Sequence, residues 1–199
     1  MNQKIIEKLI KMKKLDEQVR SELIRSNELF DGYHIEMEKI HVSNADELKK
    51  IIDEHGWPTQ DRVGQEAAHA AWLIVHHAIS KPEFQKKCLE ILKSEHLSKR
   101  INPSWIAFLQ DRIRVFEGKA QTYGTQFDWD KNGELSPRPI ENPHILDKLR
   151  RSLGLEPIDQ VIHEMRAKAE QEGNKPPTSH IEREKKFVEW TYKVGWRKN

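Results

Sequence analysis

The chain has 199 residues, which is long enough for one domain with a hydrophobic core. Its 34 basic and 32 acidic residues give a net charge of +2, which does not favour a nucleic-acid partner. No apolar run is long enough to span a bilayer, so we expect no membrane partner. The first residues lack a signal-peptide pattern, and the single cysteine, Cys88, excludes an internal disulfide. We therefore expect a cytoplasmic protein.

The first predicted element is a long amphipathic helix over residues 3–30, in which apolar side chains recur every three or four positions up to Phe30. Asp16 falls inside this apolar stripe, and Arg20 follows one helical turn later. Their spacing allows an ion pair, either at the solvent edge or in a partly buried network. The helix therefore carries an acidic side chain at a position where a core residue is expected.

Turn and capping residues predict the next elements. A turn at residues 31–32 precedes a short helix expected over residues 33–40, and Ser43 or Asn44 caps a second helix. The block GWPT at residues 56–59 predicts a loop, because the residue before a proline is disfavoured in the α region. We thus expect two separate helices between the turn at residues 31–32 and this loop.

The stretch VGQEAAHAAWLIVHHAIS, residues 63–80, contains no Lys or Arg and only one acidic residue. On a helix with about 100° per residue, one broad apolar arc forms, which is typical of a helix packed in a core. This arc consists of Ala67, Ala68, Ala71, Ile74, Val75, Ala78 and Ile79. The opposite arc carries the polar side chains, namely Gln65, Glu66, His69, His76 and His77. This polar arc is the first candidate for a functional site.

Prolines, glycines and asparagines predict the remaining elements. We expect helices over residues 82–97 and 103–117, a hairpin over residues 119–140, helices over residues 143–153 and 157–172, a linker over residues 174–178 and an aromatic and basic tail helix over residues 179–199. The predicted fold is therefore mainly α: a single multi-helix domain over residues 1–173 with one small β-hairpin, followed by the C-terminal tail helix.

Arg112 lies within the apolar arc of the helix predicted over residues 103–117. A guanidinium on a core face costs several kcal/mol unless it is paired and hydrogen-bonded, so Arg112 should have an acidic neighbour or an anionic ligand. Asp16 and Glu66 are the internal candidates. Alternatively, Arg112 reaches the surface along its apolar stem or forms a purely structural ion pair.

Polar and aromatic side chains gather on the first arm of the predicted hairpin, where Gly124 would allow the backbone to approach a neighbour closely. These side chains are Gln121, Tyr123, Thr125 and Gln126. They could orient a ligand of Arg112, or the hairpin could simply close the core.

A metal site has limited support in the sequence. The spacing Glu-x-x-His, which places two ligands on one helix face, occurs at Glu66/His69, Glu38/His41 and Glu141/His144. A di-metal site needs further inward carboxylates, and only Asp16 clearly qualifies. No metal or other cofactor is therefore predicted, although a mononuclear site with His69, His77 and a carboxylate is left open. Cys88 lies on an apolar helix face and is expected to be inert.

Several blocks, in order along the chain, resemble an uncharacterised bacterial family whose members carry GWPT, AAWLIVQHA, DRV and QxYGTQF. The matching blocks here are GWPT, AAWLIVHHA, DRI and QTYGTQF, and the resemblance covers roughly residues 9–165. It implies a helical architecture and a bacterial origin, without an established activity. The family's histidine in QHA corresponds to His77 and its arginine in DRV to Arg112, whereas its glutamine is replaced by His76.

Two classes of function stay open. The first is an enzyme that carries out acid–base chemistry of a hydrolase or lyase on a small anionic molecule. Its catalytic residues would be His69, His77 and Glu66, and its ligand-binding residues Arg112, Gln121, Tyr123, Gln126 and Asp16. The alternative is a non-enzymatic interaction module that binds a protein partner through the N-terminal helix and the aromatic C-terminal tail.

Overall fold

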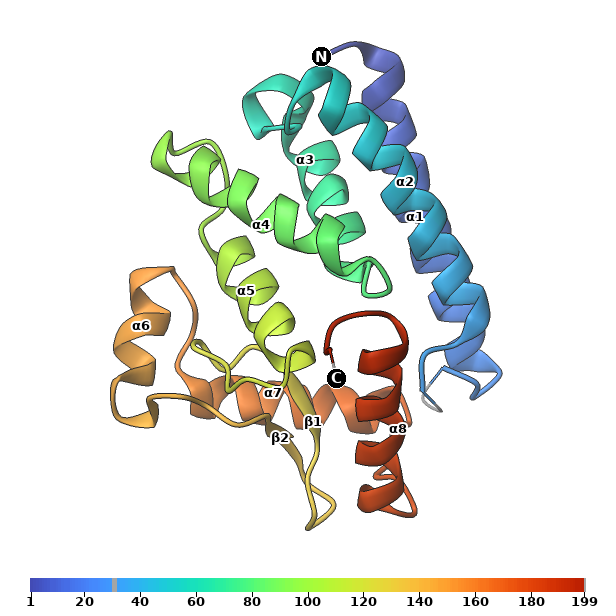
Figure 1. Ribbon diagram of the computed structural model, residues 1–199, viewed down its shortest axis with the longest axis vertical. Coiled ribbons are helices and arrows are strands. Elements are labelled where there is room, and N and C mark those ends of the chain that lie inside the picture. Colours follow the sequence, from blue (N-terminus) through green and yellow to red (C-terminus); the bar gives the residue numbers. More distant parts are fainter. Residues whose placement is uncertain (30–31, 199) are drawn as a thin grey trace. The chain divides into compact units, whose positions relative to one another are not determined.

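The computed structural model describes residues 1–29 and 32–198, and within these residues the chain forms eight α-helices and one two-stranded antiparallel sheet (Figure 1). The predicted mainly α-helical fold with one small hairpin and a C-terminal helix is confirmed. The chain divides into two compact units, Met1–Trp105 and Ile106–Asn199, which are described separately. That residues 174–178 form a linker between a domain and the tail helix stays a prediction. No helix in the described ranges has the length and hydropathy needed to cross a membrane.

The first unit is built from α1 (Gln3–Arg25), α2 (Ile35–His55), α3 (Gln60–His77) and α4 (Pro82–Leu97). The helices α1 and α2 pack against each other and against α3, which also contacts α4. The alanine-rich arc of α3 is buried, because small side chains let neighbouring helices approach closely. Cys88 on α4 is fully buried, and burial raises the pKa of its thiol to about 12, as expected for an inert core cysteine.

The helix α1 ends at Arg25 rather than at residue 30. The N–H of Ser26 bonds back to the carbonyls of Glu22 and Ile24, and Asn27 adopts a positive φ of 60°, which is incompatible with a continuing helix. Phe30 and Asp31, which were assigned to the end of this helix and to the following turn, lie outside the described residues.

The two helices predicted before the GWPT loop form one continuous helix, α2, so the predicted break near Ser43 is wrong. Residues 35–55 contain no glycine or proline, and Ser or Asn interrupts a helix only where its side chain competes for the backbone. Asn44 instead donates its Nδ2 to the carbonyl of Met12 on α1, at 3.3 Å. The tertiary contact therefore keeps this asparagine inside the helix.

The central helix α3 begins at Gln60 and ends at His77, whereas the sequence pattern extends from residue 63 to residue 80. Gly64 interrupts its first turns with φ 79° and ψ 164°, a conformation that favours glycine. The helix proper therefore starts after this kink and carries the polar histidines toward its C-terminal end.

The second unit contains most of α5 (Ser104–Phe116), which starts just before the division between the units. It continues with β1 (Phe127–Trp129), β2 (Leu135–Pro137), a 3-10 helix (Pro143–Ile145), α6 (Leu146–Ser152), α7 (Ile158–Gln171) and α8 (His180–Lys193). The strands pair antiparallel, with Phe127 opposite Pro137 and Trp129 opposite Leu135. The hairpin is thus shorter than the predicted range of residues 119–140.

Residues 121–126, which the sequence predicts as the first hairpin arm, are instead a loop. This loop is joined to the chain after β2 by an isolated bridge between Gln121 and Ile140 and by a bond from the N–H of Arg138 to the carbonyl of Gln126. Gly124 has φ 66°, and a Cβ placed there would lie 3.1 Å from Cδ1 of Ile158. The close backbone approach predicted at Gly124 is therefore present, and its neighbour is the first residue of α7.

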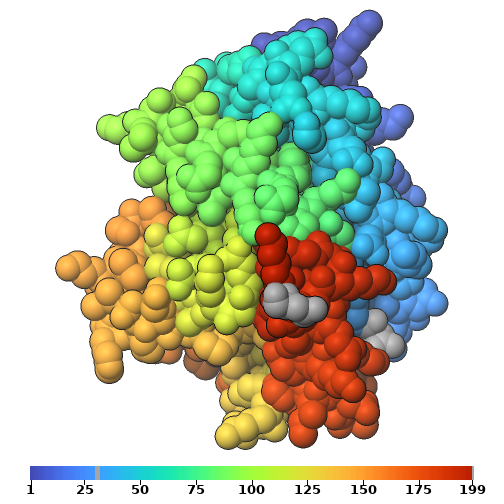
Figure 2. Space-filling view, viewed as in Figure 1, coloured from blue at the N-terminus to red at the C-terminus, as the bar shows by residue number. Residues whose placement is uncertain are grey.

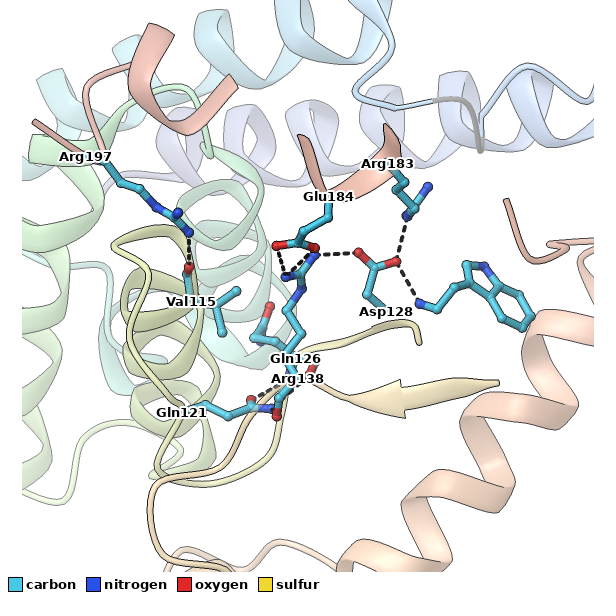
Figure 3. Close-up of polar contacts among 9 residues, drawn as sticks. Val115, Gln121, Gln126, Asp128, Arg138, Arg183, Glu184 and Arg197 are labelled. Carbon is cyan, nitrogen blue, oxygen red and sulfur yellow. Dashed lines mark hydrogen bonds and ion pairs between the residues drawn. The ribbon is translucent and has the colours of Figure 1, made fainter. Parts of the chain in front are cut away.

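An ion-pair network holds the hairpin to α8 (Figure 3). The carboxylate of Asp128 accepts from Nη2 of Arg138 at 2.7 Å and from Nε of Arg183 at 2.8 Å. Arg138 also donates to Glu184 at 3.2 Å, and its guanidinium lies 4.2 Å from the ring centroid of Phe187. These contacts fix α8 to the hairpin within the second unit.

Candidate functional site

Asp16, His41 and His77 meet inside the first unit, and each comes from a different helix. Asp16 lies on the buried face of α1 between Met12 and Leu23, and His41 lies on the buried face of α2. His77 is the last residue of α3. The side chains are brought together because α1, α2 and α3 pack against one another.

One oxygen of Asp16 contacts both imidazoles. Its Oδ2 is 2.7 Å from Nδ1 of His77, which is hydrogen-bond distance, and 3.3 Å from Nε2 of His41. The Nε2 of His41 lacks hydrogen-bond geometry, and the second carboxylate oxygen, Oδ1 of Asp16, is buried without a hydrogen-bond partner. The rings of His41 and His77 lie 5.1 Å apart. The group is therefore closely packed but not fully satisfied by hydrogen bonds.

Burial differs within this trio. Asp16 is 3% exposed and His41 is 7% exposed, whereas 29% of the His77 side chain is accessible. Burial by itself raises the pKa of Asp16, but the contacts and charges of His41 and His77 outweigh it and hold that pKa well below its usual range. Asp16 is thus a buried carboxylate that stays charged, next to one imidazole that reaches the surface.

Tyr33 extends the cluster from the chain just before α2. Its hydroxyl lies 2.8 Å from Nδ1 of His41, and the two rings stack with their centroids 5.7 Å apart. A hydrogen bond at Nδ1 fixes the orientation of the His41 ring. The Nε2 of His41 therefore faces Asp16.

The sequence predicted Asp16 and His77 as site residues for different roles, and the structure places them in contact. His41 was considered only as part of a Glu-x-x-His pair with Glu38. The carboxylate of Glu38 instead accepts from the hydroxyl of Ser80, at 2.5 Å. A continuous helix over residues 35–55 would have revealed His41 as an inward residue, because it shares a face with Met37, Asn44 and Leu48.

The other two residues predicted as catalytic lie apart from this contact group. His69 stacks on Trp72 and Trp105, with centroid distances of 5.6 and 6.3 Å, and burial lowers its pKa, with a smaller effect from Lys13. Glu66 is exposed, and its side chain makes no hydrogen bond or ion pair within the described part of the chain. Catalytic roles for His69 and Glu66 stay predictions.

The predicted ligand-binding residues Arg112, Gln121, Tyr123 and Gln126 belong to the second unit. Nε of Arg112 donates to Oε1 of Gln126 at 3.1 Å, and Arg112 is half-buried. Gln121 is fully buried and bonds to the backbone of Gln126 and Arg138 (Figure 3). These bonds favour a structural role for Gln121, while ligand binding by Arg112 and Tyr123 stays a prediction.

Asp111 is a buried residue that sequence reasoning missed. It is fully buried on α5, and its carboxylate accepts from the backbone N–H groups of Thr122, Tyr123 and Thr125 at 2.7 to 3.1 Å. The hydroxyl of Thr125 adds a fourth donor at 3.1 Å. Burial raises the pKa of Asp111 against the opposing effect of these donors. The bonds make Asp111 an anchor for the loop of residues 121–126.

A family model described as "Family of unknown function (DUF6624)" matches residues 4–170 of the chain. The match agrees with the resemblance found in the sequence, while the bacterial origin that the resemblance implies stays a prediction. Neither the curated proteins nor the solved structures provide a match. The matching family therefore supplies no activity for this site.

Proposed function

This chain belongs to the DUF6624 family, a family of unknown function, and we propose that its first unit carries an acid–base site in which His77 transfers protons and Asp16 holds the His77 ring. The observation that carries the proposal is the 2.7 Å contact between Oδ2 of Asp16 and Nδ1 of His77, with the carboxylate buried and the imidazole partly exposed. Hydrolase or lyase chemistry is the class of reaction we propose.

The carboxylate sets the tautomer of the imidazole. A buried, charged Asp16 favours the form of His77 that carries its proton on Nδ1, because this proton can then be donated to Oδ2. Proton transfer with a substrate or a water molecule would take place at the other ring nitrogen, Nε2. The imidazole would accept a proton there and return it to the leaving group, so that the site is unchanged after one cycle.

Ring-nitrogen NMR of the full-length protein tests this arrangement. In wild-type protein at neutral pH we expect His77 to carry its proton on Nδ1, with the signal assigned by its loss in His77→Gln. In Asp16→Asn the amide can donate to Nδ1, so we expect the proton to move toward Nε2. A wild-type His77 protonated on Nε2, with no change in Asp16→Asn, would refute the proposal.

Rates on small esters and hydroxy acids supply the functional part of the same test. Any turnover found should fall about 10²- to 10⁴-fold in both Asp16→Asn and His77→Gln, the range for loss of general acid–base catalysis. The matched control is Asp61→Asn, because Asp61 is an exposed carboxylate on the same helix as His77, while Glu66→Gln tests the catalytic role predicted for Glu66. A rate that depends on Glu66 and not on Asp16 would contradict the assignment.

A small anionic molecule is the ligand we propose for Arg112. Thermal unfolding of wild-type protein and Arg112→Ala with a panel of metabolite anions tests this. An anion at 100 times its Kd should stabilise the wild type by about 2.7 kcal/mol and should have no effect on the still-folded variant. Equal stabilisation of both proteins would exclude Arg112 as the binding group.

The alternative function, partner binding through the tail, receives less support from the packing. Phe187, Trp190 and Trp196 pack around Phe116 within the second unit, with centroid distances of 5.8, 5.3 and 5.2 Å. Aromatic residues proposed to reach a partner are thus in contact with the unit itself. Other side chains of α8 form part of the molecular surface (red in Figure 2), and a partner for that surface stays a prediction.

A further inference from the structure

We propose that Asp16, His41 and His77 bind one divalent transition-metal ion through Oδ2 of Asp16, Nε2 of His41 and Nδ1 of His77. The proposal shares Asp16 and His77 with the proposed acid–base site and adds His41, which the acid–base role does not require. One ligand atom of each residue lies within 4.8 Å of those of the other two, and Oδ2 of Asp16 is 2.7 Å from Nδ1 of His77 and 3.3 Å from Nε2 of His41. A modest movement of the side chains would place all three around one ion.

The donor set indicates the class of metal. Two imidazoles and one carboxylate suit zinc and divalent iron, cobalt or manganese, whereas calcium and magnesium prefer oxygen ligands. Three protein ligands leave coordination positions open, as catalytic metal sites require. The partly exposed His77 marks the side of the site from which the ion and a water or substrate could enter.

Unsatisfied atoms provide an independent reason to expect a ligand at this place. Oδ1 of Asp16 is buried without a hydrogen bond, and Nε2 of His41 is buried with a 3.3 Å contact to Oδ2 of Asp16 that lacks hydrogen-bond geometry. Both residues are more than nine-tenths buried. Buried polar atoms in folded proteins nearly always have a hydrogen-bond partner or ordered ligand, so incomplete bonding at both atoms favours a ligand here. A metal ion would bind Nε2 of His41 directly, and a metal-bound water or a second carboxylate bond would satisfy Oδ1.

Tyr33 supplies the outer contact that such a site needs. Histidines that bind metals usually donate their other ring N–H to a fixed acceptor, which orients the ring and sets the tautomer. The hydroxyl of Tyr33, 2.8 Å from Nδ1 of His41, can accept that proton. The Nε2 of His41 then presents a lone pair toward Asp16.

Metal and proton would compete for Nδ1 of His77. A bound metal ion would displace the proton that His77 shares with Asp16. A water molecule bound to the metal, rather than the imidazole, would then act as the base. This relation deepens the proposed function, because it makes metal loading decide which group acts as the base.

Titration of chelator-treated, full-length protein with Zn²⁺ by calorimetry, and with Co²⁺ by visible absorption, tests the site. We expect one ion per chain at micromolar or tighter affinity, and a loss of at least about 100-fold in His41→Gln. Tyr33→Phe should bind about 10- to 100-fold more weakly, as for other outer-shell contacts. His55→Gln is the matched control and should leave affinity unchanged, because His55 lies at the C-terminal end of α2, the helix that carries His41, and its ion-pair partner is Glu54.

Three results would overturn the metal site: no binding by the wild type, full affinity in both His41→Gln and Tyr33→Phe, or loss of binding in His55→Gln alone. If His41→Gln fails to fold, the metal affinity of Tyr33→Phe decides between the outcomes, because this substitution removes only one hydroxyl. The acid–base proposal is judged separately, because His41→Gln leaves Asp16 and His77 intact. A wild type that binds no metal but carries the His77 proton on Nδ1 would refute only the metal site.

Discussion

Asp111→Ala is expected to lower the free energy of unfolding of the protein by about 3–5 kcal/mol, because several buried donors lose their acceptor at roughly 1–3 kcal/mol each. The substitution removes one acceptor group and leaves the backbone N–H groups of Thr122, Tyr123 and Thr125 without it. Each buried donor that loses its acceptor costs about 1–3 kcal/mol, and part of this cost is recovered where water can enter. Urea unfolding followed by circular dichroism measures the loss.

Amide hydrogen exchange measures the effect of Asp111→Ala on the loop of residues 121–126 itself. The amides of Thr122, Tyr123 and Thr125 should exchange much faster in Asp111→Ala, because their acceptor is gone. Asp159→Ala is the control, since Asp159 is an exposed carboxylate in the first turn of α7 and its loss should cost less than about 1 kcal/mol. A loss of under 1 kcal/mol in Asp111→Ala, with exchange unchanged, would show that the loop does not depend on Asp111.

Arg150→Met is expected to have the second large effect, a loss of about 2–4 kcal/mol. Arg150 is 2% exposed, and its guanidinium donates to the carbonyls of Glu156, Tyr123 and Gly124 at 2.6, 2.5 and 3.3 Å. Methionine has a similar length and fills the space, so the change tests these hydrogen bonds more than packing. The gain from removing a buried charge offsets part of the loss, and unfolding in urea measures the balance.

The neighbouring Arg151→Met supplies the control for Arg150→Met. Arg151 is exposed on the same helix, so its loss should change stability by less than about 0.5 kcal/mol. Asp111 and Arg150 hold opposite polar groups of one loop, so the double variant should cost less than the sum of the single variants. Equal effects of Arg150→Met and Arg151→Met would exclude the proposed role of Arg150.

The two buried aspartates differ in a way that separates structure from function. Asp111 accepts hydrogen bonds from four donor groups of one loop, whereas Asp16 faces two imidazoles and keeps one oxygen without a hydrogen bond. A fully bonded carboxylate is typical of a structural anchor. An incompletely bonded carboxylate beside a partly exposed histidine is a stronger candidate for a functional site. This contrast is the reason for placing the proposed chemistry in the first unit.

The sequence by itself determined the helical fold, because hydrophobic spacing, prolines and glycines act locally. It also indicated Asp16 as an acidic residue on a core face and His77 as a polar residue at the end of the central helix. Both indications come from positions on a single helix, which depend only on the period of 3.6 residues.

Tertiary structure alone decided which polar residues meet. Asp16 and His77 are 61 residues apart in the sequence. They meet because α1 packs on α3, and no local sequence pattern encodes this packing. His41 joins them only because α2 is continuous through Ser43 and Asn44, with Asn44 bonded to the backbone of α1. Likewise, Asp111 becomes an anchor only when the loop of residues 121–126 folds over α5. Helix boundaries and buried polar contacts depend on partners distant in the chain, and those partners are set by packing.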